Sequence, residues 1–150
     1  MNLRPIRLGL VFIFLFLLDR IVKQFFISYP LGSEIAVIIP QIFVIRTVLN
    51  TGIAFGFLQG YSRILTAINI VIVIFLTIYI HKITSYRMKL WFTLILAGAT
   101  SNICDRFIYG GILDYIDLSF WPTFNLADTY ISLGIIGIIV DAMFAKKKKI

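Results

Sequence analysis

The sequence predicts an all-α membrane protein: a bundle of four transmembrane helices with a small β-rich element outside the bilayer. Two observations support this prediction. The chain of 150 residues is 60% hydrophobic, and its mean hydropathy is +0.98. Its apolar residues also gather in four segments, each close to the ~20 residues that a helix needs to cross a membrane. We expect spans at residues 8–27, 62–80, 90–107 and 128–145, within one integral membrane domain covering residues 1–150.

Residues 28–61, between the first two spans, are expected to form a small ordered element outside the bilayer. Its apolar part, Ile35 to Leu49, is rich in β-branched residues, but Pro40 breaks it and Arg46 interrupts it. This composition favours extended structure over a further span. Four glycines between residues 32 and 60 indicate turns.

The basic residues indicate how the chain crosses the membrane. The formal net charge is +7, and the lysines and arginines precede the first span, connect the second to the third, and follow the fourth. They do not line one amphipathic face, so we expect topological charge and no nucleic-acid partner. By the positive-inside rule both termini are cytoplasmic, and residues 28–61 and 107–128 lie on the opposite side.

The N-terminal segment is similar to a secretory signal, because two arginines precede an eleven-residue apolar run. Asp19, Arg20 and Lys23 follow where a cleavage site would have small residues, so we expect an uncleaved first helix. The chain has one cysteine, Cys104, and one histidine, His81. These counts exclude an intramolecular disulfide and disfavour a His/Cys metal cluster, so neither a metal nor a cofactor is expected.

Five polar clusters interrupt the apolar sequence, and the predicted topology brings all five to the non-cytoplasmic end. In the first, Asp19 and Lys23 are four residues apart near the end of the first helix, where they can form a structural ion pair. The second is NTGIAFG at residues 50–56. Asn50 supplies an amide there and Gly52 permits a close backbone approach, although this pattern alone is typical of an ordinary turn.

The third cluster, GATSNICDR at residues 98–106, ends the third span. Its small residues would let a neighbouring helix pack closely, and Asn102 could form a hydrogen bond across helices. Asp105 and Arg106 lie one turn further on. Arg106 could pair with a carboxylate or with a lipid phosphate.

The last two clusters each contain an aspartate. Asp114 stands in the alternating segment ILDYID, although aspartate is disfavoured in strands. Asp128 stands in FNLADTY at the start of the fourth helix, where the alternative role is that of an N-cap. Held together, two carboxylates share one proton, because like charges a few ångström apart do not both ionise cheaply. One would activate water against a peptide carbonyl, and the other would act as the acid.

In this order the clusters resemble the lipoprotein signal peptidase family, also called signal peptidase II or prolipoprotein signal peptidase, a group of bacterial membrane aspartyl proteases. The matching positions are Asp19 and Lys23; Asn50, Gly52, Ala54 and Phe55; Gly98, Asn102, Asp105 and Arg106; Asp114 with Tyr115; and Phe124, Asn125, Ala127 and Asp128. Arg20 and Val22 depart from the pattern, because relatives often have Gln and Ser or Thr there. Tyr115 replaces a common Phe.

The resemblance implies that Asp114 and Asp128 are the catalytic dyad. Asp117, three residues after Asp114, is the rival, and the motif position favours Asp114. The substrate-binding and support residues that the resemblance implies are Asn50, Gly52, Asn102, Asp105, Arg106, Asn125 and Ala127, with Asp19 and Lys23. It also implies a short interfacial helix beside the β-rich part of residues 28–61.

The same resemblance implies the substrate and the location. The family removes the signal peptide from diacylglyceryl-modified prolipoproteins, cleaving on the N-terminal side of the lipidated cysteine without a cofactor, and the cyclic peptide globomycin inhibits it. We therefore expect a multi-pass protein of the bacterial cytoplasmic (inner) membrane, in contact with membrane lipids and with its active site facing the periplasmic or extracellular side. A monomer is the default expectation.

Two other functions are compatible with polar groups in a membrane bundle. A proton-coupled transporter would use its carboxylates as a relay, and it would need them near the bilayer midplane. A non-enzymatic assembly factor would use the polar clusters only to hold helices together. The second alternative tolerates a change of either Asp114 or Asp128 to asparagine, if hydrogen bonding suffices.

Overall fold

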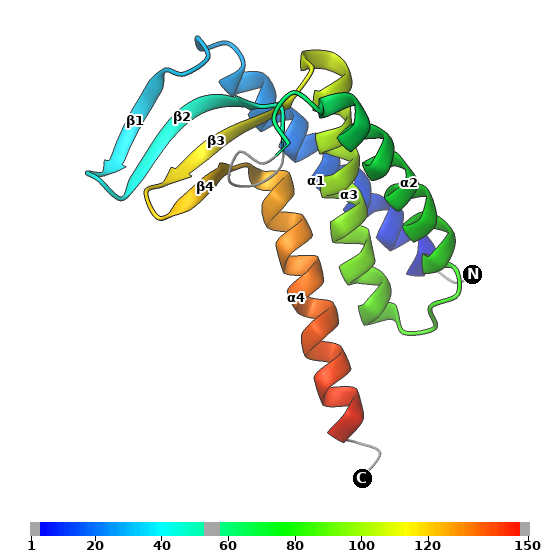
Figure 1. Cartoon of the computed structure of the whole chain (residues 1–150). Coiled ribbons are helices and arrows are strands. Elements are labelled where there is room, and N and C mark those ends of the chain that lie inside the picture. The colour runs from blue at the N-terminus through cyan, green and yellow to red at the C-terminus, as the bar shows by residue number, and fades with distance from the viewer. Residues whose placement is uncertain (1–3, 53–57, 148–150) are drawn as a thin grey trace.

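The computed structural model describes residues 4–52 and 58–147, which form four helices and one antiparallel sheet (Figure 1). The helices are α1 (Arg4–Phe26), α2 (Ser62–Ile80), α3 (Tyr86–Tyr109) and α4 (Leu126–Lys147), and the strands are β1 (Glu34–Ile39), β2 (Phe43–Asn50), β3 (Ile112–Leu118) and β4 (Trp121–Phe124). The sheet projects from one end of the helices. The first turn of α1 and the last turn of α4 both lie at the other end.

Each of the four predicted spans lies on a helix, and α2 has the predicted bounds. The other three helices begin two to four residues before the expected span. In α1 and α3 the additional first turn contains basic residues that were placed outside the hydrocarbon. Ser85, which precedes α3, has an extended backbone, and its hydroxyl accepts a hydrogen bond from the Met88 N–H at 3.3 Å. This cap explains why α3 begins at Tyr86. At its other end the left-handed conformation of Gly110 (φ 78°) stops the helix.

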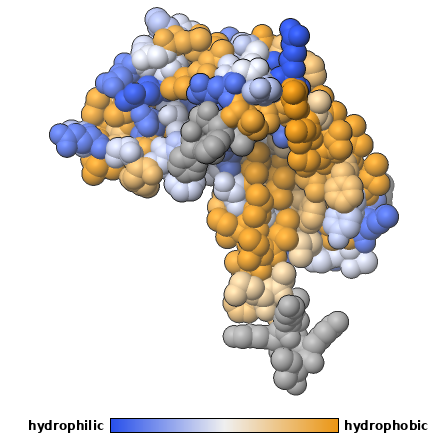
Figure 2. Space-filling model, in the orientation of Figure 1, coloured by the Kyte–Doolittle hydropathy of each residue, from blue (hydrophilic) through white to orange (hydrophobic). Residues whose placement is uncertain are grey.

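The surface of the helices is strongly apolar. Side chains such as Phe14 and Ile21 on α1 and Val71 and Phe75 on α2 are more than 60% exposed. Figure 2 shows the hydrophobic colour spread over the helices, which is typical of a surface that contacts lipid. Within residues 4–52 and 58–147, two helical segments are apolar enough, by length and composition alone, to cross a membrane: α2 and the part of α4 from Leu126 to Phe144.

The sheet has the order β1-β2-β3-β4 with antiparallel neighbours. The prediction of β structure in residues 28–61 was too narrow, because β3 and β4 come from the connection between α3 and α4. β2 pairs with β3 so that Asn50 lies opposite Ile112 and Val48 lies opposite Asp114. The expected interfacial helix is absent from residues 28–52 and 58–61. The motif residues Ala54 and Phe55 lie outside the described residues.

Helix α3 is the centre of the bundle and contacts the other three helices. The predicted close packing of its small residues is present. A Cβ atom on Gly98 would lie 2.3 Å from the carbonyl oxygen of Ala127, so only glycine fits against the start of α4. Further along the same interface, a Cβ on Gly137 would meet the Trp91 ring at 2.3 Å. This close packing holds the N-terminal turn of α4 beside the polar end of α3.

Candidate active site

The start of α4 is held by reciprocal hydrogen bonds between Asn125 and Asp128. The Asn125 side-chain oxygen accepts the backbone N–H of Asp128 at 2.9 Å, and the Asp128 carboxylate accepts the backbone N–H of Asn125 at 3.2 Å. This is the geometry of a capping box. The alternative role of Asp128 as the N-cap was therefore wrong, because Asn125 fills that position. The Asp128 carboxylate stays in the first turn of α4, with its second oxygen available to other donors.

Asp114 comes from β3 and is buried at 2% exposure. Its carboxylate accepts a hydrogen bond from the Asn50 side-chain amide at 3.0 Å and another from the Asn125 side-chain amide at 2.8 Å. Two effects raise the pKa of Asp114 from its usual value to about 8: burial, which is the larger, and the negative charge of Asp128. The two hydrogen bonds favour the ionised form but do not offset these effects. The raised pKa of Asp114 favours its protonated form at neutral pH.

Asn102, on α3, connects Asp128 to the buried lysine. Its side-chain nitrogen donates to Asp128 at 2.8 Å, and its side-chain oxygen accepts from Lys23 at 2.8 Å and from Asn125 at 3.2 Å. The bond to Lys23 fixes which end of the Asn102 amide is the donor, because an ammonium group only donates. The predicted interhelical role of Asn102 is thus present, with partners on α1 and at the start of α4.

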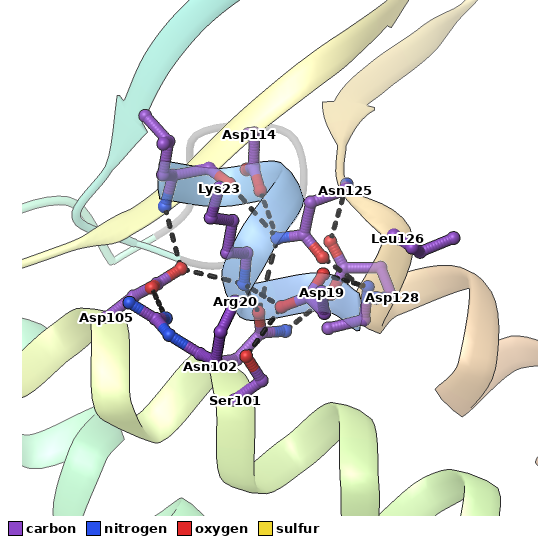
Figure 3. Close-up of polar contacts among 12 residues, drawn as sticks. Asp19, Arg20, Lys23, Ser101, Asn102, Asp105, Asp114, Asn125, Leu126 and Asp128 are labelled. Atoms are coloured by element: carbon purple, nitrogen blue, oxygen red, sulfur yellow. Dashed lines mark hydrogen bonds and ion pairs between the residues drawn. The ribbon is translucent and has the colours of Figure 1, made fainter. Parts of the chain in front are cut away.

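The predicted ion pair between Asp19 and Lys23 is part of a larger buried charge cluster (Figure 3). The Lys23 ammonium lies 2.9 Å from Asp19 and 2.7 Å from Asp105, and all three side chains are fully buried. Arg20 forms an ion pair with the other oxygen of Asp105. Two acidic and two basic groups therefore balance, which is the condition under which burying charges is tolerated.

The same carboxylates also fix the backbone around the dyad. Asp19 accepts the Ala127 N–H in the first turn of α4 at 2.9 Å and the Ser101 hydroxyl at 2.5 Å. Asp105 accepts the N–H of Leu113, next to Asp114, at 3.2 Å. The buried carboxylates of Asp19 on α1 and Asp105 on α3 therefore each position a segment that carries one of the two candidate catalytic aspartates.

Arg106 donates to a backbone carbonyl and a hydroxyl instead of the expected carboxylate. One guanidinium nitrogen donates to the Gly52 carbonyl at 2.7 Å, and the other donates to the Ser62 hydroxyl at 3.3 Å. Among the described residues no carboxylate lies within ion-pair distance of Arg106. Its guanidinium instead joins the turn after β2 to the start of α2. Asn50 begins this turn, because its side-chain oxygen accepts the Gly52 N–H at 3.0 Å.

A cavity of about 300 Å³ opens onto both aspartates. Its lining includes Asp114 and Asp128 together with Asn50, Gly52, Asn102 and Arg106. The structure therefore brings residues from α3, β2, β3 and α4 to one cavity, and it places Asp19, Lys23, Asp105, Asn125 and Ala127 behind it. The rival Asp117 lies away from this cavity, 2.7 Å from Arg46 on the neighbouring strand.

Three residues of the site were not predicted as such from the sequence. Arg20 was identified only as a departure from the family pattern, and its partner Asp105 lies 85 positions away. Asn69 lines the cavity from α2, where a single amide in an apolar helix was the available signal. The Tyr115 hydroxyl accepts the Leu126 N–H at 3.0 Å, so the tyrosine that replaces a common phenylalanine adds a contact to the start of α4.

Comparisons with known proteins agree with this arrangement. The sequence profile of the family described as "Signal peptidase (SPase) II" matches residues 11–144. The lipoprotein signal peptidase of Halothermothrix orenii is 37% identical over 126 residues, which are 83% of this chain and 87% of that protein. That of Caldicellulosiruptor bescii is 33% identical over 144 residues, with coverage of 89% and 93%.

Two solved structures are similar over nearly the whole chain. Both are described as bacterial membrane enzymes. One has a TM-score of 0.86 at 29% identity and covers 96% of this chain and 92% of its own. The other has a TM-score of 0.79 at 30% identity, with coverage of 91% and 92%. From the family match, the relatives and these neighbours, we conclude that the chain is a bacterial membrane protein that belongs to the signal peptidase II family.

Proposed function

We propose that this chain is a membrane aspartyl endopeptidase that removes signal peptides from lipoproteins. The observation that supports it best is the position of Asp114 and Asp128: both line one cavity, and both are bound to Asn125. Family membership supports the lipoprotein substrate. The finer proposal is cleavage of a diacylglyceryl-modified prolipoprotein on the N-terminal side of its lipidated cysteine.

The environments of the two carboxylates suggest how they divide the work. The raised pKa of Asp114 favours the protonated form, so we assign Asp114 as the acid of the first step and Asp128 as the base. Asp128 takes a proton from water as the water oxygen attacks the scissile carbonyl carbon, and Asp114 gives its proton to the carbonyl oxygen. As the C–N bond breaks, Asp128 passes its proton to the leaving amine. Asp114 recovers a proton from the tetrahedral intermediate, which restores the starting state.

The neighbouring groups support this chemistry without taking part in it. Asn50 and Asn125 each donate to Asp114, and Asn102 donates to Asp128, so both carboxylates are oriented before substrate binds. Within the described residues, Lys23 forms no hydrogen bond or ion pair with Asp114 or Asp128. It donates to Asn102, which in turn donates to Asp128. Arg106 lines the cavity and holds the Gly52 turn, which places it to border bound substrate.

We propose that all four helices cross the bilayer as one domain and that both termini are cytoplasmic. α1 and α3 carry more charge than a simple span, but their charged residues near the dyad are buried within the bundle. The aspartates lie at the sheet end, opposite both termini, which supports an active site on the periplasmic or extracellular side of the cytoplasmic membrane. There a lipid-anchored substrate reaches the cavity from the outer leaflet. We further propose that the protein acts as a monomer and is inhibited by globomycin.

The proposal is tested with purified full-length protein in lipid nanodiscs and a diacylglyceryl-modified prolipoprotein. Mass spectrometry of the products is expected to show one cut, directly before the modified cysteine, that globomycin blocks. An unmodified prolipoprotein is the matched control and should remain intact. Absence of cleavage, together with proton leakage through protein-containing vesicles, would favour a transporter. Absence of both activities would favour the assembly factor.

A further inference from the structure

A second cavity, of about 1020 Å³, lies between α2 and α3 at the sheet end of the bundle. Its lining includes Ser62, Arg63, Ile64 and Ala67 from α2 and Arg106 and Phe107 from α3. Neither aspartate of the dyad lines it. Ile64 and Phe107 are 57% and 70% exposed, so the cavity borders the apolar surface of the helices. Its size is at the upper end of the range of ligand pockets, and it suits a long molecule with an apolar part.

The N-terminus of α2 brings backbone donors to this cavity. The helix begins with Ser62, Arg63 and Ile64, and all three line the cavity. Tyr61, in the N-cap position, makes no side-chain hydrogen bond to the first N–H groups, and the first turn contains no acidic residue. The free N–H groups and the positive dipole end of the helix therefore favour an anion at this position.

Arg63 adds a positive charge beside this helix end. Its side chain is exposed, and within residues 4–52 and 58–147 it takes part in no ion pair. All seven acidic residues of the chain lie in the described part, and none of them lines the cavity. The charge of Arg63 is therefore not compensated by a carboxylate, and it can attract an anion.

Arg106 supplies a further donor that is already fixed in place. The residue is only 6% exposed, and its two terminal nitrogens donate to the Gly52 carbonyl and the Ser62 hydroxyl. Its third donor, the buried Nε, has no hydrogen-bond partner among the described residues. A buried N–H group without a partner is costly, so an acceptor that reaches the Arg106 Nε from this cavity would be favoured.

We propose that this cavity binds the phosphate of a membrane phospholipid from the leaflet at the sheet end of the bundle. A phosphodiester carries one negative charge, which matches the uncompensated charge of Arg63. Its oxygens accept hydrogen bonds from the first N–H groups of α2, with the Arg106 Nε as a further donor. The acyl chains lie against Ile64 and Phe107. The lipid group of the proposed substrate has no phosphate, so this site does not depend on the peptidase chemistry.

Native mass spectrometry of the full-length protein in detergent tests this site. Equal amounts of phosphatidylglycerol and of diacylglycerol with the same acyl chains are added, below one lipid per protein, and the ratio of the two retained lipids is measured. The wild type should retain phosphatidylglycerol preferentially, because only this lipid has a phosphate. The variant Arg63→Gln should lower the ratio about five-fold, the contribution of one cation near a membrane surface. An unchanged ratio would overturn the proposal.

Three controls separate this site from general surface charge. Arg46→Gln removes the same charge at the sheet end, outside the cavity lining, and also frees Glu34 and Asp117 from their ion pairs. The ratio should stay unchanged in this variant, and a loss equal to that of Arg63→Gln would overturn the proposal. Arg63→Lys keeps the charge and should keep the preference, so its loss would contradict a charge-based site. Inorganic phosphate at millimolar concentration should not displace the lipid. Displacement would overturn the lipid assignment in favour of free phosphate.

Discussion

The side-chain amide of Asn125 donates a hydrogen bond to Asp114 at 2.8 Å, and the oxygen of the same amide caps α4 by accepting the Asp128 N–H. One side chain therefore fixes the relative position of a strand carboxylate and a helix carboxylate. The two functions of Asn125 use different atoms. A substitution that keeps the cap and removes the donor can separate them.

Asn125→Ser is expected to lower activity and to lose less stability than Asn125→Ala. Serine is a good N-cap, so the start of α4 should persist, whereas the hydrogen bond to Asp114 is lost. Asn125→Ala removes both contacts and should cost about 1 kcal/mol more in stability than the serine variant. Cleavage rates and thermal melting of both variants in the same detergent check this. Equal activity of Asn125→Ser and the wild type would show that the contact to Asp114 is dispensable.

The pH dependence of cleavage should follow the proton on Asp114. Its pKa is raised to about 8 by burial and by the charge of Asp128, so Asp114 is protonated below that pH and loses its proton as the pH rises through it. A mechanism that needs this proton should therefore slow above pH 8. Initial rates across the neutral and alkaline range measure the effect. Asp117→Asn should keep the same alkaline limb, and a rate that stays constant well above pH 8 would exclude Asp114 as the acid.

Arg20→Gln should destabilise the protein by about 1–3 kcal/mol, because the fully buried Asp105 loses one charged partner and keeps Lys23. The matched control is Arg87→Gln, which breaks another Arg–Asp pair whose arginine is 67% exposed. That change should cost less than about 1 kcal/mol. Thermal melting in detergent compares the two. Equal losses would show that burial gives the Arg20 pair no special importance.

Gly98→Ala should destabilise the α3–α4 interface by about 1–3 kcal/mol, since the added methyl would lie 2.3 Å from the Ala127 carbonyl oxygen. Moving the start of α4 also moves Asp128, so cleavage should decrease as well. Gly9→Ala is the control, because nothing lies within 4 Å of a Cβ there. Thermal stability and the cleavage rate of both variants, measured under the same conditions, test this prediction. A fully active Gly98→Ala protein would contradict the packing argument.

The helices could be predicted from the sequence because their signal is local. Apolar runs of about the right length identified all four, and Ser85 and Gly110 set bounds that hydropathy alone misses. The charged residues that lower the mean hydropathy of α1 and α3, such as Lys23 and Asp105, are buried and hold the site in place. A test based on composition alone treats these charges as evidence against a transmembrane helix, although they face the protein interior.

Long-range contacts were harder to predict. The pairing of β2 with β3, in which Asn50 lies opposite Ile112, joins two separate connections, and no local pattern specifies it. The ion pair between Arg20 and Asp105 likewise depends on how α1 packs on α3. The N-cap was an alternative role for Asp128 because helix bounds from sequence are uncertain by a few residues; with α4 beginning at Leu126, the cap belongs to Asn125.

The central claim is that Asp114 and Asp128 together perform the cleavage. The most direct measurement is the rate of cleavage of a diacylglyceryl-modified prolipoprotein by Asp114→Asn and Asp128→Asn variants that insert and melt like the wild type, with Asp117→Asn as the matched control. We predict that each dyad variant loses at least roughly 10²–10⁴-fold in rate, the usual contribution of one acid–base group, while the control stays near the wild-type rate. Cleavage at the wild-type rate by either dyad variant would contradict the claim.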